Sequence, residues 1–173
     1  MPILTKSQHC AVDILHKLHC VRHSQMHVML QREFPGVNAE VQMRRLSHLG
    51  KVKSDGGCYC WPGCAPNEER LSALDIMLKM SGENPLIYDI PAPPCKLLFF
   101  VTKGPVLQAV RLYFPKPGQE TAYLAAVETE QLPPGYIAVF YIREQRQKTL
   151  LKISRPHIFV SGNGEDGYLF QRD

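Results

Sequence analysis

The sequence predicts an α+β protein in two parts. The first is a small set of three helices and a β-hairpin, and the second is a small α/β-type domain with a sheet of about five strands. Three observations lead to this expectation. Apolar residues recur at helical spacing three times before residue 50. A glycine pair then separates two short alternating segments, and strand-length apolar runs dominate the chain after residue 95.

Three amphipathic helices are expected in the first fifty residues. Apolar residues at positions 11, 14, 15, 18 and 21 predict a first helix over residues 7–21. Ser24 is a good start for the second helix, and Pro35-Gly36 ends it. Asn38 is a favourable N-cap for the third helix, and Gly50 ends it.

Residues 51–61 predict a β-hairpin. Lys51-Val52-Lys53 alternates polar and apolar side chains, and Asp55-Gly56-Gly57 supplies the positive φ angles of a tight turn. The returning strand places Cys58 and Cys60 on one side, with Tyr59 and Trp61 on the other. Three helices followed by such a hairpin are the order of a winged helix-turn-helix, whose third helix enters the major groove of DNA.

Residues 5–63 resemble a winged-helix domain, on the segment HSQMHVMLQREFPGVNAEVQMRRLSHLGKVKSDGGCYCWPG. The layout of the whole chain is similar to the replication-relaxation proteins of bacterial mobile elements, with NEERLSALDIMLKM and PPCKLLFFVTKG carrying the second part. The resemblance implies a winged-helix domain over residues 1–64 and an α/β C-terminal domain of unknown role over 65–173. It also implies binding of double-stranded DNA, as a transcriptional regulator or replication accessory, and no established reaction.

The expected DNA contacts lie on the third helix and on the strand that follows it. An arginine can bond guanine in bidentate fashion, and lysines meet phosphates. The candidate DNA-binding residues are Gln42, Arg44, Arg45, Ser47, His48, Lys51 and Lys53. The alternative is that these side chains only keep a surface soluble. Because winged helices also dock proteins, a protein–protein interaction module without DNA binding is the alternative function.

The placement of charge favours a polyanionic partner for the N-terminal third. Residues 1–60 hold eight Lys and Arg against four Asp and Glu, so they carry the whole formal net charge of +4. Five of the seven histidines lie within the first 27 residues and add positive charge when protonated. Such an asymmetry is typical of proteins that approach nucleic acid.

The cysteines and histidines raise the question of a metal site. Zinc takes about four ligands, usually from Cys pairs separated by two to four residues. Cys58, Cys60 and Cys64 do not have this spacing, and His16, His19 and His23 share a face only on one continuous helix. The sequence therefore predicts no metal site and no cofactor, although metal binding by the three cysteines or by the three histidines stays open.

A cytoplasmic location is expected. Apolar runs such as residues 97–101 are far shorter than the ~18–20 residues that cross a bilayer, and the N-terminus lacks the apolar core of a signal peptide. In a reducing cytoplasm cysteines are free thiols or metal ligands far more often than disulfides.

The second part is expected to contain two helices, a further helical turn and several strands. One expected helix begins after Asn67, a second covers residues 119–130, and the helical turn covers 145–147. The expected strands are 96–102, 107–114, 136–143, 149–153, 157–160 and 168–171. Metal-dependent nucleases need clustered carboxylates, such as an Asp followed by Glu-x-Lys, and these strands lack them. A nuclease is therefore the least favoured alternative. No enzyme is expected, and a homodimer or protein contact is expected through this domain.

Overall fold

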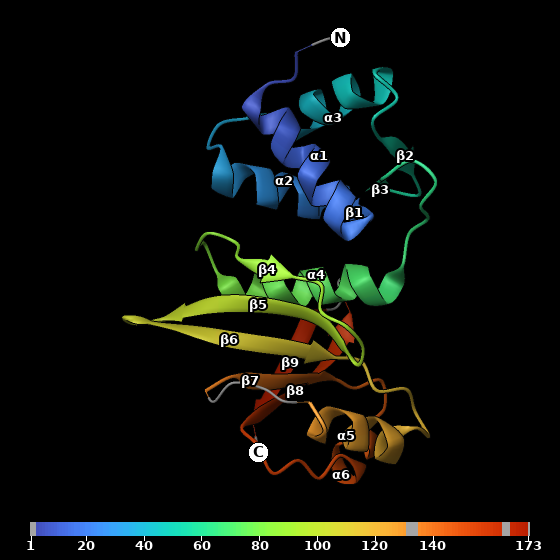
Figure 1. Ribbon diagram of the computed structural model, residues 1–173, viewed down its shortest axis with the longest axis vertical. Helices are drawn as coiled ribbons and strands as arrows, with labels where there is room; N and C mark the ends of the chain where they lie inside the picture. Colours follow the sequence, from blue (N-terminus) through green and yellow to red (C-terminus); the bar gives the residue numbers. More distant parts are fainter. Residues whose placement is uncertain (1–2, 131–134, 164–166, 173) are drawn as a thin grey trace. The chain divides into compact units, whose positions relative to one another are not determined.

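The computed structural model describes residues 3–130, 135–163 and 167–172. It divides into two compact units, Met1–Leu86 and Ile87–Asp173. Both combine helices and strands, so the prediction of an α+β protein is confirmed (Figure 1). The division falls later than residue 64, where the sequence suggested a boundary.

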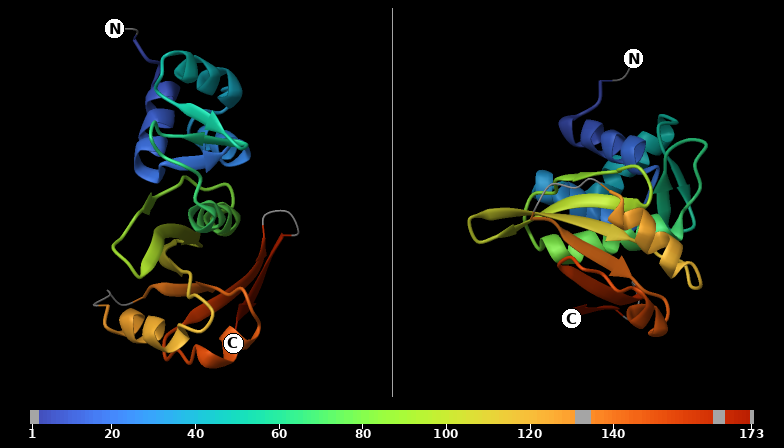
Figure 2. Two further views of the ribbon diagram at one scale, coloured as in Figure 1. Left: turned by 90° about the vertical axis from the view of Figure 1, so that its right-hand side faces the viewer. Right: turned by 60° about the horizontal axis from the view of Figure 1, so that its bottom comes forward.

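The first unit contains four helices and one small sheet. Its elements are α1 (Lys6–Leu18), β1 (Cys20–Arg22), α2 (His23–Glu33), α3 (Ala39–His48), β2 (Lys53–Asp55), β3 (Cys58–Cys60) and α4 (Glu68–Ser81). The three strands are antiparallel, in the order β1-β3-β2. The three predicted helices and the predicted hairpin are all present, and Figure 2 shows the small sheet beside α1 and α3.

Strand β1 is an element that the sequence did not predict. The expected first helix ran to Val21, but α1 ends at Leu18 because His19 adopts a φ of +68° and turns the chain. Val21 then pairs with Tyr59 of β3, and the Val21 side chain is completely buried. The start of α1 is fixed by Thr5, whose side chain accepts a hydrogen bond from the Gln8 amide.

Helix α4 belongs to the first unit because polar side chains of β1 and α2 bind it. The guanidinium of Arg22 pairs with Asp75 and, at 2.9 Å, with Glu68. The buried amide of Gln25 donates to the Leu71 carbonyl at 2.7 Å and to Asp75 at 2.6 Å. At the other end of α2, Arg32 donates to the carbonyl of Leu78 at 3.1 Å and to the hydroxyl of Ser81 at 2.9 Å. These contacts extend the unit beyond the hairpin.

The second unit is built on a sheet of six strands, not the five expected. Its elements are β4 (Tyr88–Asp89), β5 (Cys95–Lys103), β6 (Val106–Tyr113), α5 (Glu120–Glu128), β7 (Ile137–Tyr141), α6 (Arg146–Leu150), β8 (His157–Asn163) and β9 (Gly167–Arg172). The strands follow chain order, β4-β5-β6-β7-β8-β9. The β6–β7 and β7–β8 pairs are parallel and the other pairs are antiparallel, so the sheet is mixed.

The strand predicted over residues 149–153 is wrong. Helix α6 occupies Arg146–Leu150, and its first turn is fixed by Gln147, whose side chain is completely buried. The side-chain oxygen of Gln147, Oε1, accepts hydrogen bonds from the backbone amides of Arg143 and Glu144. The side-chain nitrogen Nε2 donates to the Pro115 carbonyl at 3.0 Å. A helical turn satisfies these groups where the apolar spacing alone suggested a strand.

A buried polar network crosses the core of the second unit. The ring of Tyr113 stacks on Phe140 at a centroid distance of 5.0 Å, and its hydroxyl donates to Glu130 at 2.7 Å. Arg111 lies 3.6 Å from the same carboxylate, and both side chains of this pair are about 15% exposed or less. Burial, and then the bond to Glu130, raise the pKa of Tyr113 well above its ordinary value. Tyr113 therefore remains a neutral donor.

We expect Tyr113→Phe to lower the free energy of unfolding of the second unit by about 1–2 kcal/mol, because a buried hydrogen bond to a carboxylate is lost. Hydrogen exchange of β6 and β7 peptides measures this change. Tyr141→Phe is the matched control, since its hydroxyl bonds the Gly162 carbonyl at an exposed site. Equal protection of β6 in wild type and Tyr113→Phe would contradict the prediction.

Candidate nucleic-acid interface

Helix α3 presents a polar face to solvent. Asn38 caps the helix by accepting a hydrogen bond from the Val41 amide at 3.1 Å, and Met43 and Leu46 are completely buried. Arg44 and Arg45 are exposed on the opposite side. The helix spacing predicted by the apolar residues therefore sets which side chains reach the surface.

The other candidate residues of α3 differ in exposure. His48 is exposed, whereas Ser47 and Gln42 are half-buried. The Oε1 atom of Gln42 is buried and has no hydrogen-bond partner within the described ranges. The carbonyl oxygen of Gln42 is therefore not presented at the surface.

The β2–β3 hairpin follows α3 directly. Gly56 and Gly57 have φ angles of +53° and +76°, the pair of positive values that a two-residue hairpin turn requires. Lys51 and Lys53 are exposed, and the ammonium of Lys53 lies 3.1 Å from the carboxylate of Asp55. The hairpin thus carries two lysines, one of which is already paired.

A groove lies between the N-terminus of α2, helix α3 and the hairpin. Its volume is about 490 Å³, and its lining residues are His23, Glu40, Arg44, Ser47, His48, Ser54 and Tyr59. Three of the predicted DNA-binding residues are brought together here, all from α3. The groove joins residues from α2, α3, β2 and β3.

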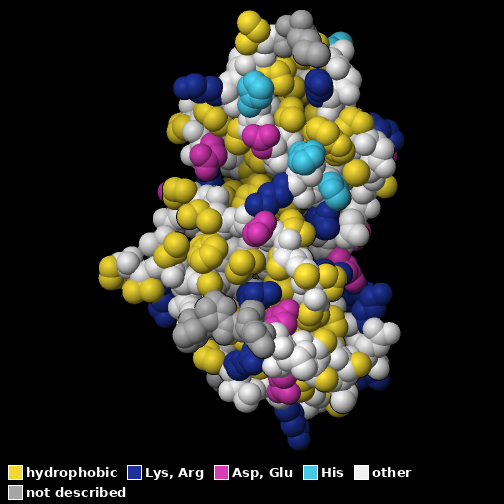
Figure 3. Space-filling view, in the orientation of Figure 1, with side chains coloured by type: hydrophobic (Ala, Val, Ile, Leu, Met, Phe, Trp, Pro, Cys, Tyr) yellow, Lys and Arg dark blue, Asp and Glu magenta, His cyan; other side chains and the backbone are white. Residues whose placement is uncertain are grey.

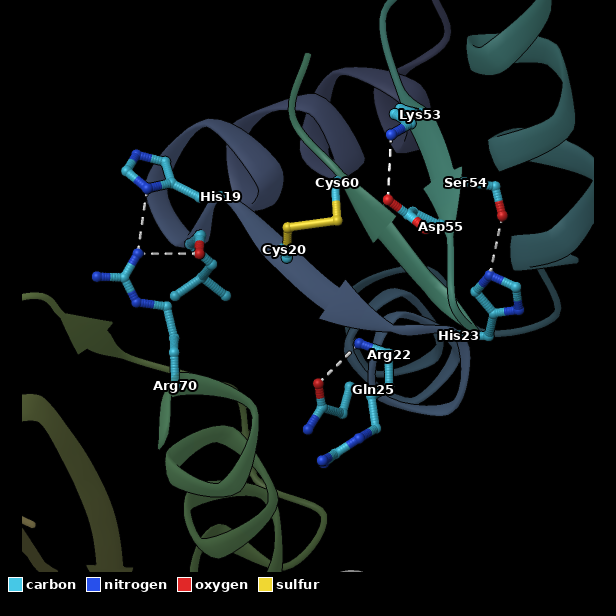
Figure 4. Close-up of a disulfide and its surroundings, with 11 residues drawn as sticks. His19, Cys20, Arg22, His23, Gln25, Lys53, Ser54, Asp55, Cys60 and Arg70 are labelled. Carbon is cyan, nitrogen blue, oxygen red and sulfur yellow. Dashed lines mark hydrogen bonds and ion pairs between the residues drawn. A yellow bond between two sulfur atoms is a disulfide. The ribbon is translucent and has the colours of Figure 1, made fainter. Parts of the chain in front are cut away.

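His23 and Tyr59 both line this groove, and neither is among the DNA-binding residues predicted from the sequence. Their rings are stacked at a centroid distance of 4.1 Å and an angle of 25°. Nε2 of His23 lies 3.3 Å from the Ser54 hydroxyl, so β2 also contacts the imidazole (Figure 4). Burial is the main cause that raises the pKa of Tyr59, which keeps its hydroxyl protonated. Tyr59 lies between Cys58 and Cys60 in β3, and this alternation is the sequence signal that places Tyr59 on the other side of the strand from the two cysteines.

The basic side chains of the interface fall into two groups. Arg44 pairs with Glu40 at 2.9 Å across one helical turn, and Lys53 pairs with Asp55. Arg45, His48 and Lys51 have no ion-pair partner in the part of the chain that the structure describes. Arg45 and Lys51 carry charge that a ligand could neutralise, whereas Arg44 and Lys53 are partly neutralised within the protein.

The two compact units do not differ in formal charge, although the charge is distributed unevenly along the sequence. Each unit contains ten Lys and Arg and eight Asp and Glu, because the first unit also includes Glu68, Glu69, Asp75 and Glu83 of α4 and the segment after it. On the face shown in Figure 3, basic, acidic and histidine side chains of the first unit lie intermixed with hydrophobic ones. The first unit as a whole therefore carries no larger formal excess of positive charge than the second.

One pair of cysteines differs from the expectation of free thiols or metal ligands, whereas Cys10, Cys58, Cys64 and Cys95 are free thiols. Cys60 forms a disulfide with Cys20, so it offers no thiolate to a metal together with Cys58 and Cys64. Cys58 and Cys60 are both buried in one cluster, which agrees with their expected position on one side of the hairpin.

The three histidines do not share a helix. His16 lies on α1, His19 follows that helix and His23 begins α2, because β1 interrupts the expected continuous helix. The described residues include no group of three or more His, Cys, Asp or Glu side chains placed to hold a metal ion.

Comparison of the chain with models of protein families and with curated proteins finds no match. Within the described ranges, every helix is too short or too polar to cross a lipid bilayer.

We expect Gly57→Ala to lower the free energy of unfolding of the first unit by about 1–2 kcal/mol, because a side chain is strained at positive φ. A Cβ at this position would meet no atom within 4 Å, so the cost is conformational. Urea unfolding followed by fluorescence of Trp61 measures it, since this is the single tryptophan and it lies in the first unit. Lys51→Ala is the control, and a midpoint for Gly57→Ala equal to wild type would refute the prediction.

Proposed function

We propose that the first unit is a winged helix that binds double-stranded DNA, with α3 in the major groove and the β2–β3 hairpin as the wing on the flanking backbone. The element order α1-β1-α2-α3-β2-β3 supports this proposal. A ten-residue helix is about 15 Å long, and the major groove is about 12 Å wide and admits an α-helix.

The observation that carries the proposal is the position of α3 directly before the hairpin, with exposed basic side chains that have no ion-pair partner among the described residues. Arg45 and His48 lie on α3, and Lys51 lies where the chain enters the hairpin. Phosphate groups would supply the negative charge that the described protein residues do not supply to these side chains. A bidentate arginine contact would read guanine, and the lysine would fix register on the backbone.

The ion pair between Arg44 and Glu40 places a carboxylate within the proposed interface. Their N–O distance is 2.9 Å, and both side chains are about two-thirds exposed. An exposed pair of this kind contributes little to stability. Its carboxylate would stand close to phosphates in a complex, so it would weaken non-specific binding.

Regulation of transcription, or a replication accessory role on a mobile element, remains the prediction for the biological use of this binding. A protein-interaction module is the alternative function. The two differ in salt dependence, because neutralised phosphates release counterions and contacts between proteins do not. The expected role of the second unit in dimerisation or partner binding remains a prediction.

The test is fluorescence anisotropy of a labelled random duplex with the full chain, at salt concentrations of about 50 to 200 mM. We expect binding that weakens steeply over this range. Arg45→Ala with Lys51→Ala should make the slope of log K against log salt shallower by about 0.9 for each lost phosphate contact.

The matched control for this double variant is Lys116→Ala with Lys152→Ala, which removes two exposed lysines from the second unit. The control should bind as wild type does. Equal slopes for both double variants would remove Arg45 and Lys51 from the interface. Absence of binding at the lowest salt would leave the interaction module as the better account.

Glu40→Gln should raise the affinity for the same duplex about fivefold at low salt, since removing one carboxylate near phosphates changes the free energy by ~1 kcal/mol. The gain should shrink as salt rises, because screening weakens the repulsion that Glu40 causes. Glu128→Gln, at an exposed carboxylate of the second unit, is the control. An unchanged affinity for Glu40→Gln would show that α3 does not face the phosphates.

A further inference from the structure

The sulfur atoms of four cysteines gather at one side of the small sheet. Cys20 on β1 and Cys60 on β3 face each other in the strand register and form a disulfide (Figure 4). Together with Cys58 and Leu71 they form a buried cluster, against which Cys64 packs. A disulfide therefore lies in one cluster with two free thiols.

A tight turn brings Cys64 back to the disulfide. The Trp61 amide donates to the His19 carbonyl at 2.6 Å, which fixes the end of β3 beside the start of β1. The amide of Cys64 then donates to the Trp61 carbonyl at 3.0 Å, with Pro62 and Gly63 between them and a φ of +84° at Gly63. Proline followed by glycine at positive φ is the signature of a type II turn.

One cavity is lined both by Cys64, which has a free thiol, and by Cys20 of the disulfide. Its volume is about 300 Å³, and Cys20 and Cys64 both line it. Cys60 is completely buried and is not among the lining residues. Of the two disulfide-bonded residues, Cys20 is therefore the one that shares a cavity with Cys64.

The same cavity carries a permanent positive charge. Arg70 lines it, and Nη1 of Arg70 donates to the Leu18 carbonyl and to Nδ1 of His19, both at 3.2 Å (Figure 4). Because the guanidinium stays protonated, His19 accepts this bond through an unprotonated Nδ1. Attack of a thiolate on a disulfide spreads negative charge over three sulfurs, and a fixed guanidinium stabilises such charge.

We propose that Cys64, Cys20 and Cys60 form a thiol–disulfide exchange site. The thiolate of Cys64 attacks Sγ of Cys20, the Cys20–Cys64 bond forms as the Cys20–Cys60 bond breaks, and Cys60 leaves as a thiolate. The proton lost by Cys64 is taken up by Cys60, and no oxidant or reductant is consumed. The exchange moves the covalent link of β1 from β3 to the segment between β3 and α4. It does not depend on the proposed binding of DNA.

Cys58 is the competing thiol, and its surroundings disfavour it. The side chain is 4% exposed, and it does not line the cavity. Burial raises the pKa of the Cys58 thiol above its ordinary value, with an opposing effect from Arg22. Since the thiolate is the nucleophile, Cys58 attacks a disulfide less readily.

The test maps disulfides in the full chain after prolonged labelling with N-ethylmaleimide at neutral pH, by peptide mass spectrometry without reduction. We expect wild type to show Cys20–Cys60 and also Cys20–Cys64 with the label on Cys60. Cys64→Ser should reduce labelling of Cys60 to background, whereas Cys58→Ser should leave it unchanged. Arg70→Gln should slow the labelling of Cys60, and Arg70→Lys should restore much of it.

Cys60→Ser provides an independent arm, with circular dichroism to verify that the variant is folded. Oxidation of this variant with diamide should join Cys20 to Cys64. Pairing of Cys20 with Cys58, or a free Cys20, would overturn the proposal. Labelling of Cys60 in wild type that persists in Cys64→Ser, or absence of any Cys20–Cys64 bond in wild type, would overturn it as well.

Discussion

The reversal of the chain at His19 is the constraint on which the first unit depends. A non-glycine residue at positive φ costs about 1–2 kcal/mol, so the surroundings must hold it. The His19 amide donates to the Leu15 carbonyl, and its carbonyl accepts from the Trp61 amide. This reversal places β1 against β3. It thereby sets Cys20 opposite Cys60, brings Arg22 to α4 and starts α2 with His23 over Tyr59.

Local signals in the sequence predicted the elements that depend on local interactions. The spacing of apolar residues gave the first three helices, and Asn38 marked the start of α3 through its capping side chain. Gly56 and Gly57 predicted the hairpin because no other residue type adopts those φ angles as readily. The expected strands over 96–102 and 107–114 and the expected helix over 119–130 correspond to β5, β6 and α5.

Elements that depend on distant partners could not be predicted in the same way. Val21 continues the helical spacing of α1, and only pairing with β3 makes it part of a strand. A helical turn was expected over 145–147, but the continuation of α6 to Leu150 in place of a strand was not, and no local pattern reveals the bond of the buried Gln147 amide to Pro115. The distribution of charge was visible in the sequence, but its meaning changed once α4 proved to belong to the first unit.

The disulfide also depends on β1, since Cys20 and Cys60 are 40 residues apart and meet only through strand pairing. Disulfides are typical of oxidising compartments. The Cys20–Cys60 disulfide is therefore unexpected for a protein of the reducing cytoplasm, and the cytoplasmic location stays a prediction. The candidate site has the same dependence on distant pairing, because the stacking of His23 on Tyr59 joins residues 36 positions apart by way of the same sheet.

The binding of α4 by Arg22 and Gln25 decides how the chain can be divided for study. A fragment that stops after the hairpin would remove Glu68, Asp75 and the Leu71 carbonyl. It would leave a guanidinium and a buried amide without their partners and would uncover the apolar side of β1 that α4 contacts. The shortest piece of chain that keeps the proposed DNA-binding surface and the contacts that support it therefore reaches to the end of α4.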